Sequence, residues 1–265
     1  MSAALVKKKF EKMGAKVNMT SEIPSRLRYA LGGPPEFNID FRNGVFEIYT
    51  AKPDKVEIMD VRPKERHLLL MARMNDGNAK FLCGHDERNW FVASAGENVS
   101  NVAEAKDHLM PNSVREAQKA SGVNHKKRHQ RHTEGSHRQG EWFFTPAPDF
   151  VPGKKEVIHK KEPMVRSGGG KPHVVDECIR HGGKLAYINT RDSSDVLTPQ
   201  KFAKIDAFEK RYYRQATSGA KVYVRGRVRH PDHATLVLNG WHVITPNSEK
   251  RMLPGGGRAS MTFYD

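Results

Sequence analysis

The segment KVYVRGRVRHPDHATLVLNGWHVI, residues 221–244, determines the C-terminal part of the fold. Two runs rich in β-branched residues flank RHPDH, and this pattern predicts two antiparallel strands joined by a Pro-Asp turn. Side chains of a strand alternate between its two faces, so Val222, Val224 and Val228 are expected to point into the core. The opposite face, called here the cationic strand face, then carries Lys221, Tyr223, Arg225, Arg227 and Arg229.

The cationic strand face is a candidate nucleic-acid surface. Basic side chains neutralise phosphates, and an aromatic ring stacks on unpaired bases. No acidic residue lies between Lys221 and Arg229, whereas an ordinary exposed strand mixes both signs of charge. The alternative is an exposed face whose charges only discourage edge-to-edge pairing. The residue pattern favours the nucleic-acid surface.

Three histidines lie in and after the predicted turn. His230 and His233 flank Asp232, and His242 follows one strand later. Imidazole nitrogens and a carboxylate are zinc ligands, so the three histidines are candidates for a zinc site with Asp232 as the fourth ligand. A plain Pro-Asp turn with neighbouring histidines is the favoured interpretation, and no cofactor is expected.

A second basic stretch is HKKRHQRHTEGSHR, residues 125–138, called here the basic segment. Few apolar residues interrupt it, so a role in the core is not expected. Its cations would neutralise phosphates and release counterions. The alternatives are a solvated loop or a metal site formed by its four histidines. The predicted nucleic-acid contacts are Lys126, Lys127, Arg128, Arg131 and Arg138, and the histidines are His125, His129, His132 and His137.

The string CGHDER, residues 83–88, mixes the side chains of a nucleophile, a base and two acids. Cys83 and His85 would have to meet in space to act as a catalytic pair. The string lies where a turn is predicted between two strands, and Gly, His and Asp are common in turns. A structural turn is therefore favoured over catalysis, and no catalytic residue is assigned.

The charge of the chain is concentrated. The 265 residues contain 45 Lys and Arg against 30 Asp and Glu, a net charge of +15. Residues 121–173 carry 11 basic and 5 acidic side chains, and residues 201–265 carry 12 and 5. These two segments hold +13 of the total, which favours a polyanionic partner over a charge spread for solubility.

Two further features restrict the class of protein. No apolar run approaches the roughly 20 residues that a membrane-spanning helix needs, so no membrane partner is expected. The only cysteines, Cys83 and Cys178, are too few for a disulfide framework. This cysteine usage favours a reducing, cytoplasmic location.

Strand patterns fill the first hundred residues. Asn43-Gly44 between two of them is a strong signal for a tight hairpin. We therefore expect a mainly antiparallel β structure in this part of the chain. The runs are FNIDF (37–41), VFEIY (45–49), KVEIMDV (55–61), HLLLMARM (67–74), KFLCG (80–84) and NWFVASA (89–95).

Helical patterns follow. VAEAKDHL (102–109) and NSVREAQKA (112–120) predict two short helices, with Asn101 and Asn112 as N-caps. Apolar residues at helical spacing predict one longer helix near 198–216. The expected fold class is therefore α+β, with antiparallel sheets and hairpins, a few short helices and one longer helix.

Four parts are expected along the chain. They are a β-rich N-terminal part (1–100), short helices with the basic segment (101–150), a linker rich in Pro, Gly and Lys (151–172), and a C-terminal α+β part (173–265).

Three strings resemble sequences in an uncharacterised family of bacterial proteins. They are RQGEWFF (138–144), CGHDERNWFVA (83–93) and VYVRGRVRHPDHATLVLNGWH (222–242). The resemblance implies no activity and assigns no functional residue. The residues themselves favour a nucleic-acid-binding protein without its own catalysis, with RNA or single strands preferred to duplex DNA. The alternatives are a metal-dependent enzyme that cleaves phosphodiesters and a scaffold that binds an acidic protein.

Overall fold

Two compact units make up the protein. The first comprises Met1–Met110 and Ser248–Ala259, and the second is built from Pro111–Asn247. Antiparallel strands predominate and the helices are short, as the sequence predicts. No described helix has the length and apolar character needed to span a membrane. The computed structural model describes residues 1–27, 35–165, 171–192, 195–252 and 258–260.

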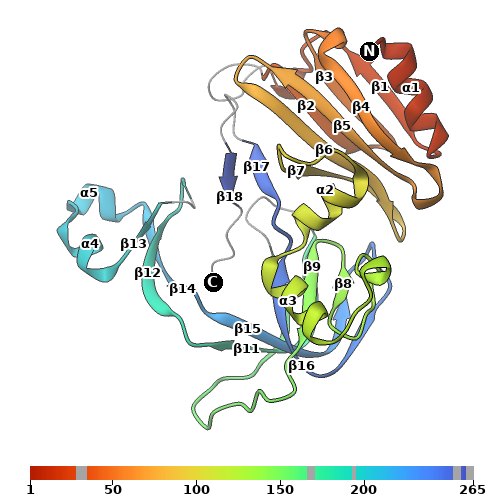
Figure 1. Cartoon of the computed structure of the whole chain (residues 1–265). Helices are drawn as coiled ribbons and strands as arrows, with labels where there is room; N and C mark the ends of the chain where they lie inside the picture. The colour runs from red at the N-terminus through yellow and green to blue at the C-terminus, as the bar shows by residue number, and fades with distance from the viewer. Residues whose placement is uncertain (28–34, 166–170, 193–194, 253–257, 261–265) are drawn as a thin grey trace. The chain divides into compact units, whose positions relative to one another are not determined.

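The described part of Met1–Met110 in the first unit contains two helices, three 3-10 turns and seven strands. These elements are α1 (Ala3–Lys12), β1 (Lys16–Thr20), η1 (Ser25–Leu27), β2 (Phe37–Arg42), β3 (Val45–Thr50), η2 (Pro53–Lys55), β4 (Val56–Arg62), η3 (Pro63–Glu65), β5 (His67–Met74), β6 (Gly77–Asp86), β7 (Asn89–Ala95) and α2 (Val102–Leu109). One sheet has the order β1-β3-β2, with β1 parallel to β3, and the other is the antiparallel sheet β4-β5-β6-β7 (Figure 1).

Both faces of β5 are buried. Leu68 and Leu70 belong to one apolar cluster, whereas Leu69 faces a second cluster that contains Leu109 of α2. This explains why β5 reads as a nearly continuous apolar run instead of an alternating one. The predicted hairpin at Asn43-Gly44 is confirmed, because both residues adopt positive φ angles (50° and 81°) between β2 and β3.

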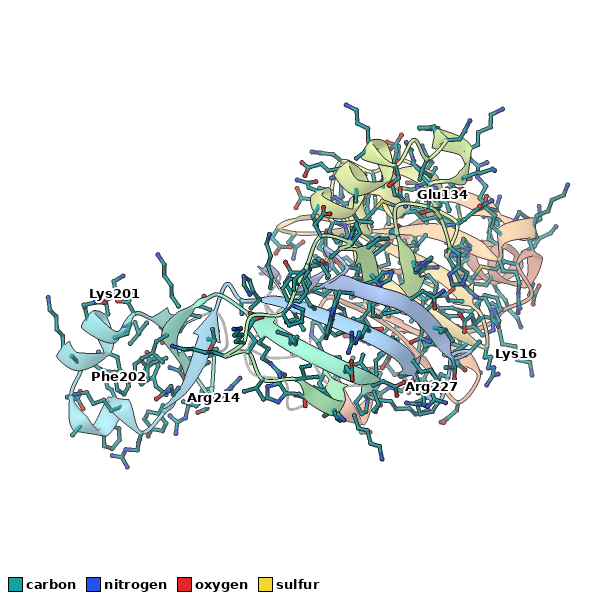
Figure 2. The ribbon with its side chains drawn as sticks, turned by 90° about the horizontal axis from the view of Figure 1, so that it is seen from below. Lys16, Glu134, Lys201, Phe202, Arg214 and Arg227 are labelled. Atoms are coloured by element: carbon teal, nitrogen blue, oxygen red, sulfur yellow. The ribbon has the colours of Figure 1, made fainter. Side chains whose placement is uncertain are left out.

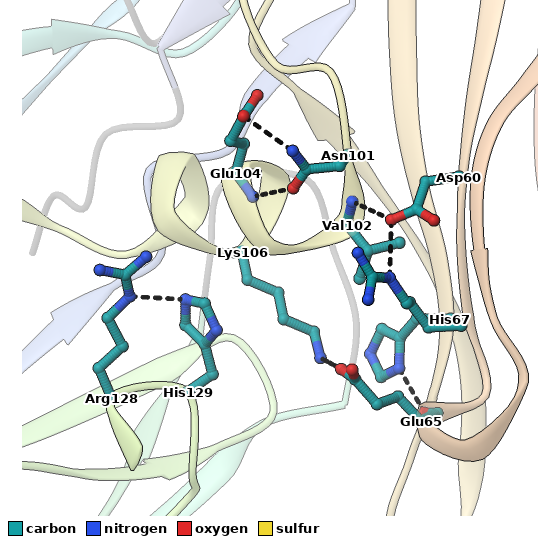
Figure 3. Close-up of polar contacts among 10 residues, drawn as sticks. Asp60, Glu65, His67, Asn101, Val102, Glu104, Lys106, Arg128 and His129 are labelled. Carbon is teal, nitrogen blue, oxygen red and sulfur yellow. Dashed lines mark hydrogen bonds and ion pairs between the residues drawn. The ribbon is translucent and has the colours of Figure 1, made fainter. Parts of the chain in front are cut away.

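The start of α2 is fixed by side chains, as Figure 3 shows. Asn101 Oδ1 accepts the backbone N–H of Glu104 at 3.0 Å, and the Glu104 carboxylate accepts from Asn101 Nδ2 at 2.8 Å. The Asp60 carboxylate on β4 accepts the N–H of Val102 at 3.0 Å. The predicted cap at Asn101 is therefore confirmed. The hydrogen bond from Val102 to Asp60 ties the helix to the sheet.

The second unit is organised around a six-stranded antiparallel sheet. Its elements are α3 (Asn112–Ala120), η4 (His125–Lys127), β8 (His137–Gln139), β9 (Trp142–Pro146), β10 (His159–Met164), β11 (His173–His181), β12 (Lys184–Asn189), β13 (Val196–Leu197), α4 (Pro199–Lys204), α5 (Ala207–Lys210), β14 (Tyr213–Ser218), β15 (Lys221–Arg229) and β16 (Leu236–Pro246). The strand order in the large sheet is β10-β11-β15-β16-β9-β8. Strand β17 (Lys250–Met252), which belongs to the first unit, pairs with β18 (Arg258–Ser260).

Two sequence expectations can be compared directly with these bounds. Helix α3 begins at Asn112 with Pro111 at its N-cap position, so the cap predicted at Asn112 is wrong by one residue. The segment predicted as a linker, 151–172, contains strand β10, and its residues 166–170 lie outside the described part.

The predicted hairpin of 221–244 is confirmed as β15 and β16. The three valines of β15 are buried as expected, in a cluster with Trp142 and Phe144 of β9. The pairing shifts register near Gly226, which has a φ of +85°. A Cβ at this position would lie 2.8 Å from the Cβ of Asp176, so the glycine lets β11 approach closely.

The longer helix predicted near 198–216 is wrong. The chain forms α4, then α5, and then β14, which pairs with β12 over six residues. The helix breaks because Ile205 has an extended backbone and the Asp206 side chain accepts the N–H groups of Phe208 and Glu209. Residues 184–218, called here the insert, thus form a small sheet and two short helices beyond the ends of β11 and β15 (Figure 1).

Candidate functional site

The cationic strand face is paired with carboxylates from the neighbouring strand β11. Arg227 Nε lies 3.2 Å from the Asp176 carboxylate, and Arg229 Nη1 lies 2.7 Å from it. Arg225 forms an ion pair with Glu177 and covers the Trp241 ring at 4.6 Å. The predicted surface of cations without acids therefore does not form, because the acids come from a strand nearly fifty residues away in the sequence.

The carboxylate of Asp176 is well adapted to this position. It accepts the backbone N–H of Arg227 at 2.9 Å in addition to the two arginine side chains. These hydrogen bonds, first the one from the Arg227 backbone and then the one from Arg229, lower the pKa of Asp176 to about 2. Asp176 is consequently ionised at neutral pH and offsets part of the positive charge of β15.

Tyr223 was expected on an exposed face but is buried. Only 9% of the residue is exposed, and its ring stacks on Phe150 with centroids 3.6 Å apart and planes 5° from parallel. Ile179 and Trp241 complete this small apolar cluster. The tyrosine lies on the face opposite the valines, as expected, but that face is covered at this point. Tyr223 is therefore not available to stack on a base.

The basic segment is held in place by α3. Gln118 Nε2 donates to the Arg128 carbonyl at 3.0 Å and to Ser136 Oγ at 2.9 Å. Ser136 and Thr133 are buried, so the segment contributes polar side chains to the interior, contrary to the sequence expectation. The Asn124 side chain accepts the N–H of Lys126 and caps the 3-10 turn η4.

The cations of the basic segment differ in their surroundings. Lys126 and Lys127 are exposed, and neither side chain has an ion pair within the described chain. Arg128, Arg131 and Arg138 are half-buried. Arg128 Nε lies 3.3 Å from His129 Nε2 (Figure 3). Arg138 Nη1 donates to the Gly140 carbonyl, just beyond the segment. The two lysines are thus the most accessible cations of the segment.

The insert combines aromatic rings, of which Phe208 is exposed, with cations. The Phe208 side chain is 60% exposed, and the Arg211 guanidinium lies 3.4 Å from its ring centroid. Arg191 lies 3.6 Å from the centroid of Tyr212. Seven Lys and Arg residues of the insert outnumber its four Asp and Glu residues. Figure 2 shows Lys201, Phe202 and Arg214 on the same insert.

Sequence reasoning missed the insert because it placed these rings on the buried face of a helix. The signal that was present is the string FEKRYYR, residues 208–214, in which rings and cations alternate. The interior of the insert is small. In it the Tyr187 ring stacks on the Phe202 ring, with centroids 3.7 Å apart. Phe208 is left outside it, with Tyr212 at its edge.

Three histidines converge at one end of the large sheet. A nitrogen of each of His173, His230 and His233 lies within 4.8 Å of the others. The His173 and His230 rings stack with centroids 4.2 Å apart, and those of His230 and His233 are 4.7 Å apart. Of the predicted zinc ligands, His230 and His233 lie together, and the third histidine of the cluster is His173.

The other two predicted zinc ligands are elsewhere. The His242 ring lies beside His137 at 5.6 Å, in a separate row that His137 continues to His132 at 5.4 Å. The carboxylate of Asp232 binds Lys171 Nζ at 2.7 and 2.9 Å. Asp232 therefore holds the turn against the chain before β11, and the predicted set with His242 and Asp232 is wrong.

His173 has unusual surroundings for an ionisable side chain. It is 1% exposed, and neither ring nitrogen has a hydrogen-bond partner among the described residues. Burial, together with the nearby His230 and His233, lowers its pKa to about 3, so the ring is neutral. Sequence reasoning missed His173 because only the pairing of β11 with β15 brings the start of β11 beside the end of β15.

The CGHDER string does not form a catalytic site. Cys83 is fully buried in β6, and burial raises the pKa of its thiol, which removes the thiolate needed for attack. The strand continues to Asp86, so the predicted turn is shorter than expected and comprises Glu87 and the next residue. The His85 ring packs edge-on against Trp90 at 5.0 Å.

Comparison of the chain with models of protein families, with curated proteins and with solved structures finds no match in any of the three. The functional assignment therefore depends on the geometry described above.

Proposed function

We propose that the protein binds single-stranded nucleic acid, through the insert and the basic segment, without catalysis of its own. The observation that carries the proposal is the pair Phe208 and Arg211 on the insert. The Phe208 ring is 60% exposed, and the guanidinium above it supplies positive charge at the same place.

This arrangement suits an unpaired base better than a duplex. A base stacks on an aromatic ring or on a guanidinium plane, and its phosphate then lies near the neighbouring cations. Tyr212 with Arg191 repeats the same combination, and its ring lies 5.7 Å from Phe208. Two adjacent ring–cation pairs favour two successive nucleotides. In a duplex the bases are already stacked and do not present their faces to the rings.

The basic segment contributes a different kind of contact. Lys126 and Lys127 are exposed and can neutralise phosphates without sequence preference. The cationic strand face contributes less, since a phosphate there would compete with Asp176 and Glu177 for the arginines. Binding should therefore depend on the insert for stacking and on the basic segment for charge.

The test is fluorescence anisotropy with a labelled single-stranded oligonucleotide at low salt. Phe208→Ala is expected to weaken binding by about 1–3 kcal/mol, the range for loss of one base stack. Leu5→Ala is the matched control, because Leu5 is an exposed apolar side chain on α1 in the first unit. Equal affinities of wild type and Phe208→Ala would remove the insert from the proposal, and absence of any binding at low salt would remove the proposal itself.

Metal-dependent phosphodiester cleavage is the second candidate, and the cluster of His173, His230 and His233 is the observation that favours it. It is tested by following intact oligonucleotide with and without added Zn²⁺. Cleavage that requires the metal would support the enzyme over simple binding.

A further inference from the structure

We propose that His173, His230 and His233 form a binding site for a divalent transition metal such as Zn²⁺. The inference is independent of nucleic-acid binding. His173 opens β11, while His230 and His233 lie in the turn that follows β15. Because Val174 pairs with Arg229, the antiparallel register brings the start of β11 beside this turn. Two separate segments of the chain therefore supply the three imidazoles.

The first argument is the state of His173. A buried polar group without a hydrogen-bond partner is destabilising, and here both ring nitrogens are in this state within the described structure. A neutral imidazole is the form that binds a metal, and coordination would provide one nitrogen with a partner. An apolar side chain could fill the same space without leaving unpaired nitrogens, so packing alone does not account for a histidine here.

The second argument is the space beside two of the nitrogens. A Cβ on Gly140 would lie 2.9 Å from His233 Nε2 and 3.3 Å from His173 Nε2. Both nitrogens thus face the side of the β8–β9 turn that carries no side chain. Gly140 has a φ of +58°, a conformation that other residues rarely adopt, so the turn itself also favours glycine here. Glycine at this position thus keeps a side chain away from both nitrogens.

The ligand set selects the kind of metal. Three imidazoles suit Zn²⁺, Cu²⁺ or Ni²⁺, whereas Mg²⁺ and Ca²⁺ prefer oxygen ligands. Tetrahedral zinc with nitrogen at about 2.0–2.1 Å places its ligand atoms about 3.4 Å apart. The histidine nitrogens lie within 4.8 Å of one another, so binding requires the rings to move together by about an ångström. Three protein ligands would leave the fourth position to water.

The required movement involves the His230 ring and its present hydrogen bonds. Its ring is nearly parallel to that of His173, so the two sets of in-plane lone pairs do not yet meet. His230 Nδ1 accepts the N–H of Asp232 at 3.1 Å, and Nε2 lies 3.2 Å from the Lys171 carbonyl. Binding of the metal would replace one of these two bonds. His230 is only partly buried, so water can satisfy the group that is released.

The experiment titrates metal-free, full-length protein with Co²⁺, whose tetrahedral complexes absorb visible light, and with Zn²⁺ in a calorimeter. The wild type is expected to bind one ion tightly with a tetrahedral Co²⁺ spectrum. His230→Gln and His233→Gln should each weaken binding more than about 100-fold, because loss of even an outer-shell partner costs 10- to 100-fold. Both residues are partly exposed, so these variants should fold.

The control removes histidines of the basic segment. The double variant His125→Gln, His132→Gln should bind Co²⁺ as the wild type does, because both residues are exposed and lie outside the cluster. A wild type without stoichiometric binding would overturn the proposal. So would a loss of binding in the control with retention in His230→Gln, since the ion would then be held by the basic segment.

His173→Leu separates coordination from packing. The variant is expected to lose the metal and to melt at a higher temperature than the metal-free wild type, because it removes two unsatisfied buried nitrogens. Retained metal binding in His173→Leu would overturn the assignment of this ligand. If the variant does not fold, His230→Gln and His233→Gln still decide the proposal. Oligonucleotide binding, measured with a chelator present, reports separately on the proposed function.

Discussion

The cationic strand face and the insert belong to the same unit, yet the arginines of the strand face are paired with carboxylates, including Arg225, which also lies over Trp241. On the strand face, Asp176 and Glu177 form ion pairs with three arginines. On the insert, Arg191 and Arg211 lie over aromatic rings. A carboxylate cancels the charge of an arginine, whereas a ring leaves that charge in place and offers a stacking surface. The partner of each cation, and not the number of cations, is therefore the basis on which we propose the insert as the stacking surface.

The largest expected effect is a loss of folding stability at the strand face with no change in oligonucleotide affinity. Tyr223→Ala removes a buried ring that stacks on Phe150, so the free energy of unfolding should fall by about 3 kcal/mol, as for other large-to-small changes in a core. Denaturant unfolding measures this loss. Oligonucleotide affinity at a temperature where the variant is folded should stay unchanged. A stable variant with weakened binding would mean that the ring is available to bases.

The salt dependence of binding compares the basic segment with the insert. If about six phosphates are neutralised, the logarithm of affinity should fall with the logarithm of salt concentration at a slope near −4 on a single strand. Replacing both Lys126 and Lys127 by Ala should reduce this slope by roughly 1 to 1.5. Phe208→Ala should lower affinity at every salt concentration with little change in slope. A flat response of the wild type would contradict a role for phosphate neutralisation.

A smaller effect is expected from freeing the arginines of the strand face. Asp176→Asn removes the carboxylate paired with Arg227 and Arg229 and should tighten oligonucleotide binding by roughly two- to threefold at low salt, the effect of one additional cation. Unchanged or weaker binding would indicate that these arginines do not face the ligand. The same anisotropy assay provides the measurement.

The same variant also has a pH signature. The folded pKa of Asp176 is about 2, below the unfolded value near 3.9, so the carboxylate stabilises the fold fully above about pH 4. This contribution is lost as the pH falls from about 4 towards 2. The melting temperatures of wild type and Asp176→Asn should therefore differ at pH 5 and converge near pH 2. A constant difference over this range would contradict the ion pairs described here.

Two local signals were read correctly from the sequence, whereas contacts between distant segments were not. The hairpin at Asn43-Gly44 and the helix cap at Asn101 depend on a few adjacent residues, and both are confirmed. The burial of Tyr223 depends on Phe150, which comes from another part of the chain. No pattern within 221–229 shows that segment 147–150 covers this face.

Two further errors have the same origin. The helix predicted near 198–216 is interrupted because its last residues pair with β12, and helical spacing of apolar residues does not reveal a strand partner. The histidine cluster was only partly identified since His173 lies 57 positions before His230 in the sequence. Only the register of β11 against β15 brings the two residues together.

The most direct test of the comparison measures the affinity of one labelled single-stranded oligonucleotide for two matched double variants. Phe208→Ala with Arg211→Ala removes a ring–cation pair of the insert, and Arg225→Ala with Arg227→Ala removes two cations that are paired with acids. The insert variant is expected to lose roughly ten- to a hundredfold in affinity, and the strand variant less than about threefold. The reverse order of losses would contradict the assignment of binding to the insert.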